Sequence, residues 1–191
     1  IGSRGLGDVY KRQLLREGKG STCEGGHRVP GIFWGGDIKP SVIDDLGSTM
    51  DIFPTILEMS NSAQVDDRII DGLSIKNTLL NLEPSKREKV IFYREREVYA
   101  LRYRQFKAHF ITKGAYNYPS RDTKTYMKNP LLYNLDIDPS EKYNIADENP
   151  EILKKIYEVL ESHENNLNAP EDLLQYRDNN GNIDGVNDSL D

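Results

Sequence analysis

The first half of the chain carries three apolar patterns, which predict one strand and two short helices. Residues 29–34, VPGIFW, form a short apolar run that ends at two glycines, as a buried strand of a parallel sheet does. Residues 48–59 place apolar side chains at helical spacing, after a Ser-Thr pair that can cap the first turn. Pro54 is tolerated there if it lies within about the first turn. A second short helix is predicted over residues 74–82, with Ser74 as its cap.

From Lys86 onward the pattern changes to short segments of β-branched and aromatic residues with alternating polarity. The predicted strands cover residues 90–94, 97–104, 106–112 and 131–135. In the second of them the alternation places Ala100 on one face and Leu101 on the other. Because the first three segments follow one another closely, they predict an antiparallel meander. Residues 113–129 are polar, rich in tyrosine and without a period, so we expect a loop there.

The last predicted element is a helix that begins at Asn149 and Pro150. Asparagine is a favoured cap, proline is favoured at the first helical position, and Glu151 lies near the positive end of the helix dipole. Its apolar stripe comprises Ile152, Leu153, Ile156, Val159 and Leu160. The patterns together predict an α/β segment followed by a small antiparallel sheet that a C-terminal helix covers.

We expect four segments along the chain. Residues 14–85 form the α/β part, and residues 86–168 form the part with the sheet and the helix. Residues 1–13 lack apolar periodicity and can be back-translated in part into a transposon-end sequencing adapter, so we interpret them as a sequencing or cloning scar. The natural chain would then begin directly after them, as a fragment of a longer protein. Residues 169–191 form an acidic tail that is expected to be disordered, although residues 180–191 partly follow the oxygen spacing of an EF-hand.

Composition and charge exclude several classes of function. The 191 residues carry a net charge of −6, which argues against a nucleic-acid-binding protein. A local basic group is interspersed with glutamates at its start and is interpreted as a solvated strand face. It comprises Arg94, Arg96, Arg102, Arg104 and Lys107. No apolar run approaches the roughly 18 residues of a membrane helix, and the one cysteine excludes an internal disulfide.

One glycine-rich stretch, REGKGSTCEGGHRVP, concentrates the candidate chemistry. Lys19 lies between two glycines, so its backbone and ammonium group can approach an anion, although the spacing is not that of a P-loop. Cys23 could be a nucleophile only with His27 as its base, and an inert, buried thiol is the alternative. Glu24 and Arg28 are expected to pair with each other or with the backbone. The three histidines lie too far apart in the sequence to predict a histidine metal site.

Several motifs resemble those of the type I sulfatases and occur in the same order. Residues 15–30 resemble the signature Leu-Arg-x-Gly-Lys-Gly-(Ser/Thr)-x-x-Glu-Gly-Gly-x-Arg-x-Pro, and residues 48–59 resemble the helix Asp-(Ile/Leu)-x-Pro-Thr-(Ile/Leu)-Leu. Residues 71–74 resemble the Asp-Gly-x-Ser turn, and residues 132–144 the segment Leu-Tyr-(Asn/Asp)-Leu-x-x-Asp-Pro-x-Glu-x-x-Asn. Residues 107–114, KAHFITKG, are similar to the branch that contains arylsulfatase A and galactosamine-6-sulfatase.

This resemblance implies that the chain is the C-terminal part of a sulfate-ester hydrolase with the alkaline-phosphatase-like α/β fold. It implies that Lys19 contacts the sulfate, as a catalytic and substrate-binding residue, and that His109 lines the substrate pocket. The family uses a formylglycine nucleophile and a calcium ion, Ca2+. The precursor motif of formylglycine is absent from this chain. We therefore expect the nucleophile and the calcium ligands upstream, and no activity from the isolated chain.

The implied substrate is a sulfated small molecule or a sulfated carbohydrate, and the family tends to be extracytoplasmic. Two other classes of function stay open beside the sulfatase. A phosphohydrolase or phosphonate hydrolase on the same fold would use a Thr or Ser nucleophile with additional His and Asp metal ligands. A non-catalytic binding module would keep the fold and lack the nucleophile.

Overall fold

The computed structural model describes residues 14–63, 65–94, 96–115 and 123–167. The predicted scar at residues 1–13 and the predicted tail at residues 169–191 lie outside the described residues. The chain divides into two compact units, one that ends at Tyr157 and one that begins at Glu158. Within the described ranges, no helix is long and apolar enough to cross a membrane.

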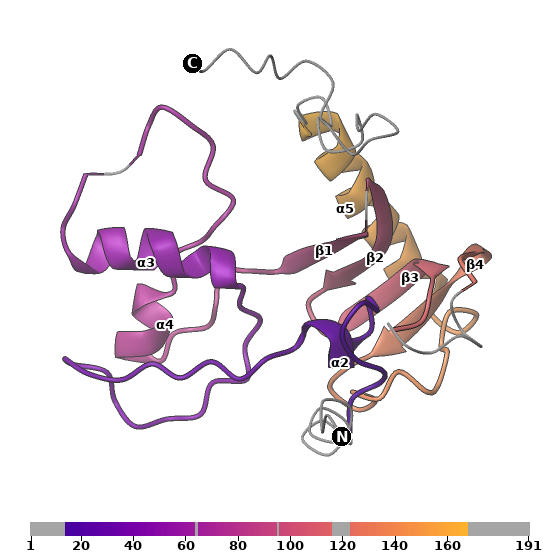
Figure 1. The fold of residues 1–191 in the computed structure, drawn as a ribbon, viewed down its shortest axis with the longest axis horizontal. Coiled ribbons are helices and arrows are strands. Elements are labelled where there is room, and N and C mark those ends of the chain that lie inside the picture. The colour runs from indigo at the N-terminus through magenta and orange to yellow at the C-terminus, as the bar shows by residue number, and fades with distance from the viewer. Residues whose placement is uncertain (1–13, 64, 95, 116–122, 168–191) are drawn as a thin grey trace, which may run out of the picture. The chain divides into compact units, whose positions relative to one another are not determined.

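Four strands form one antiparallel sheet with the order β1-β2-β3-β4, which confirms the predicted meander (Figure 1). The strands are β1 (Lys89–Arg94), β2 (Glu97–Tyr103), β3 (Phe106–Thr112) and β4 (Thr125–Asn134). The register pairs Ala100 with His109 across β2 and β3, and Lys107 with Tyr133 across β3 and β4. Because directly paired residues point to the same side, these side chains share one face of the sheet.

Strand β4 is longer than the sequence predicts. It begins at Thr125 rather than at Leu131, so the expectation of a loop over residues 113–129 was wrong for the last part of that range. Thr125 and Tyr126 pair with the end of β3 after a register shift. The polar sequence is compatible with a strand because β4 lies at the edge of the sheet, where exposed polar residues and Pro130 are tolerated.

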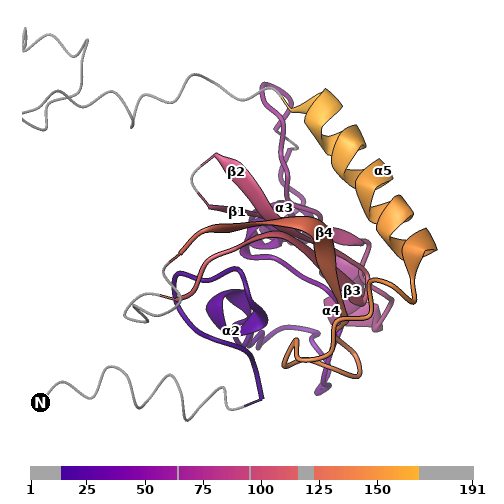
Figure 2. The same cartoon turned by 90° about the vertical axis from the view of Figure 1, so that its right-hand side faces the viewer.

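The two faces of the sheet are covered by different elements (Figure 2). One face packs against the first turns of helix α5 (Pro150–Asn166), where the rings of Phe110 and Tyr157 lie 5.7 Å apart. The buried apolar residues include Tyr99, Leu101, Ala108, Leu132 and Ile156. The opposite face carries Lys107 and His109 and is covered by the segment that contains α2 (Glu24–His27). Helix α5 starts at Pro150, as predicted.

The helix predicted over residues 48–59 is present in two parts. A short 3-10 turn, η1 (Thr49–Asp51), leads into α3 (Ile52–Met59). Ser48 caps the turn as expected, since its Oγ accepts the N–H of Met50 and the Asp51 carboxylate accepts the N–H of Ser48 at 2.8 Å. The second predicted helix, α4, covers only Lys76–Asn81.

Asp51 joins these two helical segments. Its buried carboxylate accepts the N–H of Leu73 at 2.8 Å and pairs with the guanidinium of Arg87. Burial alone would raise the pKa of Asp51, but the bonds from Arg87 and from the backbone lower it. The backbone of Gly72 lies so close to that of Met50 that an added Cβ would be 2.1 Å from the Met50 carbonyl oxygen. The motif residues of this region therefore hold two separate stretches of the chain together.

Residues 29–34 do not form the predicted strand. They are irregular, and the side chains of Ile32 and Trp34 are 90% and 94% exposed. A buried strand needs a neighbour on each side, and no strand of the described residues pairs with this run. The apolar side chains of Phe53 and Ile56 in α3 are exposed as well. The apolar pattern of this half of the chain thus marks surface in this structure.

Candidate functional site

The glycine-rich loop folds back on itself and holds Lys19 at an exposed position. Its two ends are joined because the N–H of Gly25 donates to the carbonyl oxygen of Arg16 at 2.9 Å. Gly25 has no room for a side chain, since a Cβ would lie 2.2 Å from the carbonyl oxygen of Glu17. Lys19 takes part in no ion pair among the described residues. Its ammonium group is therefore available to a ligand.

A buried group of charged side chains lies between this loop and the sheet: Glu24, Lys107, His109 and Glu141, here called the charge cluster. Lys107 is fully buried, and its Nζ lies 2.9 Å from Glu24 Oε1 and 3.4 Å from Glu141 Oε1. The same ammonium lies 4.3 Å from the centre of the Phe92 ring. The cluster thus joins the loop to β3 and to the turn after β4.

The interpretation of the basic group as a solvated strand face was wrong for two of its members. Lys107 is buried, and Arg102 is largely buried, with its guanidinium 3.6 Å from Glu24 Oε2. The register pairs Arg102 with Lys107, so both side chains share one face of the sheet, and the loop covers that face. The side chain of Glu24 consequently pairs with these two residues. Arg28 bonds Glu24 through the backbone, since its N–H donates to the Glu24 carbonyl oxygen at 2.8 Å, which is the backbone alternative of the expectation. Arg104 is exposed, as predicted.

His109 is 2% exposed, and its Nε2 lies 2.7 Å from Glu141 Oε1. Burial lowers the pKa of His109 more than the nearby carboxylate raises it. A neutral imidazole with its proton on Nε2 therefore donates to Glu141. Burial would raise the pKa of Glu141, but His109 and Lys107 lower it, so the carboxylate stays ionised.

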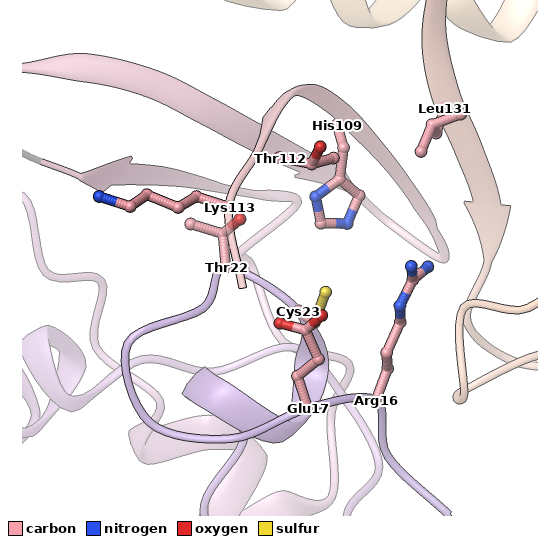
Figure 3. A pocket seen from close by; sticks show the side chains of 8 residues that line it. All are labelled: Arg16, Glu17, Thr22, Cys23, His109, Thr112, Lys113 and Leu131. Atoms are coloured by element: carbon pink, nitrogen blue, oxygen red, sulfur yellow. The ribbon is translucent and has the colours of Figure 1, made fainter. Parts of the chain in front are cut away.

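A small cavity of about 30 Å³ lies beside the charge cluster. It is lined by Arg16, Glu17, Thr22, Cys23, His109, Thr112, Lys113 and Leu131 (Figure 3). In Figure 3 the ring of His109 points toward the sulfur of Cys23 and the guanidinium of Arg16. A space of this size holds roughly one or two water molecules, whereas substrate pockets start at roughly 300 Å³. Lys19 is not among the lining residues, so the cavity brings His109 together with Cys23 and not with Lys19.

Cys23 is held as a neutral thiol. Burial, followed by the charge of Glu141, raises the pKa of Cys23 to about 12. Its neighbour is His109, and not the His27 that the sequence suggested as a base. A thiol with this pKa has almost no thiolate at neutral pH, which favours the inert alternative over the nucleophile.

We therefore expect Cys23 to react slowly with thiol reagents in the folded protein. At pH 8 the rate of alkylation by iodoacetamide should be at least tenfold below that of the unfolded chain in urea, because the thiolate fraction rises only as the pH approaches 12. Mass spectrometry of the labelled peptide measures both rates. Equal rates in the folded and unfolded protein would contradict this environment.

Cys23, His109 and Glu141 also form a group of possible metal ligands, with their donor atoms within 4.8 Å of one another. This group could not be found from sequence spacing, because its members are separated by 86 and 32 residues. Two of these potential metal ligands already have other partners. Glu141 Oε1 accepts a hydrogen bond from His109, and the ammonium of Lys107 lies 3.4 Å from the same oxygen. A cation there would compete with Lys107, so the arrangement does not fit a metal ion.

Similarity to known proteins identifies the family of the chain. Residues 85–185 match a family model described as the C-terminal region of aryl-sulfatase. The chain belongs to the aryl-sulfatase family. Arylsulfatase A of Bos taurus is 34% identical over 165 residues, which are 79% of this chain and 32% of that protein. Arylsulfatase A of Homo sapiens is 35% identical over 164 residues, or 76% of this chain and 32% of that protein.

A solved structure supports the same assignment. The PsFucS1 sulfatase from Pseudoalteromonas sp. superposes with a TM-score of 0.68 and 27% identity, over 78% of this chain and 32% of that chain. The predicted fold class, the C-terminal part of a sulfatase fold with a small antiparallel sheet and a C-terminal helix, is confirmed. The chain spans about a third of the length of these sulfatases.

Two residues that hold the glycine-rich loop in place were not predicted as site residues. Glu141 binds the loop from the turn after β4, and Arg16 donates to the carbonyl oxygen of Glu141 at 2.8 Å. Both lie in motifs that resemble the family, and this was the signal that could have drawn attention to them. Neither contact is visible from spacing alone, because the bonded residues are 125 and 117 positions apart.

Proposed function

We propose that this chain is the C-terminal part of a sulfatase that hydrolyses sulfate esters, and that it contributes Lys19 to the active site. The observation that carries the proposal is the position of Lys19 at the exposed turn of a loop whose two ends are bonded to Glu141, in the turn after β4. The resemblance of residues 15–30 to the sulfatase signature implies that this lysine contacts the sulfate, and the aryl-sulfatase family of the chain supports that interpretation. The two findings together favour a sulfate contact over an ordinary surface lysine.

The chemistry of Lys19 follows from its surroundings. Its ammonium is a compact positive charge with three donors, and no carboxylate of the described chain forms an ion pair with it. It can therefore donate to a sulfate oxygen and stabilise negative charge that develops as the ester bond breaks. A charge placed in advance, without reorganisation, acts on the transition state more than on the free ester.

His109 is proposed to line the substrate pocket that this chain forms together with the protein outside it. Its Nε2 is bonded to Glu141, and its ring faces the small cavity beside the loop. A contact with the substrate would therefore come from the rest of the ring, with Glu141 fixing its orientation.

The nucleophile and calcium are proposed to come from protein outside this chain. The sequence lacks a Cys or Ser followed by the x-Pro-(Ser/Ala)-x-Arg pattern of a formylglycine precursor. Calcium prefers six to eight oxygen ligands, and the cluster of Cys23, His109 and Glu141 offers sulfur, nitrogen and a carboxylate bonded to other groups. The described residues thus do not fit a calcium site.

The exposed apolar side chains support a longer protein. Ile32, Trp34 and Ile56 precede the strands of the sheet in the sequence, and their side chains are largely exposed. Exposed apolar side chains of this size offer surface for packing against further protein. The relatives extend over about three times the matched length, which is enough protein to cover it.

The substrate class is proposed from the relatives. Besides arylsulfatase A, they include N-acetylgalactosamine-6-O-sulfatase of Bacteroides thetaiotaomicron, 31% identical over 78% of this chain. We infer a sulfated carbohydrate or a small sulfate ester as the substrate of the complete protein.

Hydrolysis of 4-nitrophenyl sulfate by the complete protein and by the 191-residue chain tests the proposal. We expect turnover by the complete protein and none above background by the chain alone. 4-Nitrophenyl phosphate is the control substrate. Faster hydrolysis of the phosphate than of the sulfate would indicate a phosphohydrolase, and hydrolysis of neither ester would indicate a binding module.

A further inference from the structure

We propose that Glu141 is a positioning residue for Lys19, an inference that rests on the proposed sulfate contact. Glu141 binds both ends of the loop that carries Lys19. Its backbone carbonyl oxygen accepts from Arg16 at 2.8 Å, three residues before Lys19. Its carboxylate Oε2 accepts the N–H of Glu24 at 2.8 Å, five residues after Lys19. One residue of the sheet part thus contacts the loop on both sides of Lys19.

Glu141 is itself held in place. It is 0% exposed, and its other carboxylate oxygen bonds His109 at 2.7 Å and lies 3.4 Å from Lys107. Its backbone has a φ of 52°, a conformation that costs energy for a residue with a side chain. The N–H of Glu141 donates to the carbonyl oxygen of Asp138 at 3.1 Å, which stabilises this turn. A strained and fully bonded residue of this kind is suited to fix a neighbouring segment.

Between these two ends, the loop around Lys19 is shaped by local bonds. Ser21 donates its N–H to Gly18 at 3.1 Å, and Gly20 has a φ of 95°. These local bonds shape the turn around Lys19 but do not connect it to the sheet. The position of Lys19 therefore depends on the contacts of the loop ends: the two contacts with Glu141, the pair of Glu24 with Lys107 and the bond of Arg16 to Tyr133. A displacement of about 1 Å in a catalytic group can cost roughly a hundredfold in rate.

The experiment uses the complete protein and measures kcat and KM with 4-nitrophenyl sulfate. Glu141→Gln should lower kcat by roughly ten- to a hundredfold, and Glu141→Asp, which keeps the charge but shortens the side chain, should lower it less. Glu88→Gln is the matched control, because Glu88 is an exposed residue that pairs with Arg104 at 2.5 Å, and its kcat should be unchanged.

Two further measurements separate positioning from a general loss of structure. In a Lys19→Ala background, Glu141→Gln should cause no additional loss of kcat, because its effect acts through Lys19. Amide hydrogen exchange of the peptide that contains Glu24 should become faster in Glu141→Gln and not in Glu88→Gln.

The possible outcomes distinguish this inference from the proposed function. Suppose that Lys19→Ala lowers kcat, and that Glu141→Gln lowers kcat by the same factor in the Lys19→Ala background as in the wild type. Glu141 then does not act through Lys19, and the inference is wrong. Unchanged exchange at Glu24 would also overturn it. If the complete protein does not hydrolyse the sulfate, or if Lys19→Ala has no effect, the proposed function fails and this inference with it.

Discussion

Replacing Lys107 with methionine is expected to lower the free energy of unfolding by about 3–5 kcal/mol, the range for breaking a buried ion pair. Lys107 is 0% exposed and lies 2.9 Å from Glu24 and 3.4 Å from Glu141. Methionine fills similar space but leaves two buried carboxylates without their shared cation. Arg102, at 3.6 Å from Glu24, compensates only one of them.

Urea denaturation followed by circular dichroism measures the change. Lys124→Met is the matched control, because Lys124 directly precedes β4 and pairs with Glu97, but both side chains are partly exposed. Water replaces such a partner at little cost, so the unfolding midpoint of the control should stay close to that of the wild type. A similar loss of stability in both variants would contradict the role assigned to the charge cluster.

The sheet was predictable because its signal is local. Alternation in β2 places Ala100 and Leu101 on opposite faces, and the closely spaced segments leave room only for hairpins. The capped turn at Ser48 and the start of α5 at Pro150 were predictable for the same reason. Each depends on residues within a few positions of one another.

What covers a face could not be predicted in this way. The sequence predicted a solvated strand face for Lys107 and Arg102, yet the glycine-rich loop lies over that face and buries both side chains. Residues 29–34 have the apolar pattern of a buried strand, yet Ile32 and Trp34 are exposed. In both cases the outcome depends on which distant segment packs against the pattern, and periodicity carries no information about that segment.

The motifs of the family resemblance have a common structural meaning. Asp51 binds Arg87 and the Asp-Gly-x-Ser turn, Glu24 binds Lys107, and Asn144 accepts the N–H of Leu132 at 2.9 Å. Each motif residue joins segments that are far apart in the sequence or fixes a turn. Residue types at fixed spacing therefore indicated the family, whereas the partners became visible only in three dimensions. Lys19 is different, because it is exposed and binds none of these segments.

That difference leads to the largest expected effect on activity. Lys19→Ala in the complete protein should lower kcat/KM for 4-nitrophenyl sulfate by about 10²–10³-fold, the loss seen when one preorganised charge-stabilising donor is removed. The unfolding midpoint should not change, since the side chain is exposed and forms no ion pair among the described residues. A variant that loses activity and stability together would point to a structural role instead.

Lys39→Ala is the matched control, because Lys39 is another exposed loop lysine that forms no ion pair within the described part of the chain. Its kcat/KM should remain within about twofold of the wild type, since a surface charge away from the reacting bond is screened by solvent and salt. Lys19→Arg keeps the charge but changes its shape and reach, so it should recover only part of the activity. Equal activity of Lys19→Ala and Lys39→Ala would remove Lys19 from the active site, and the exposed turn of the loop would then be an ordinary surface feature.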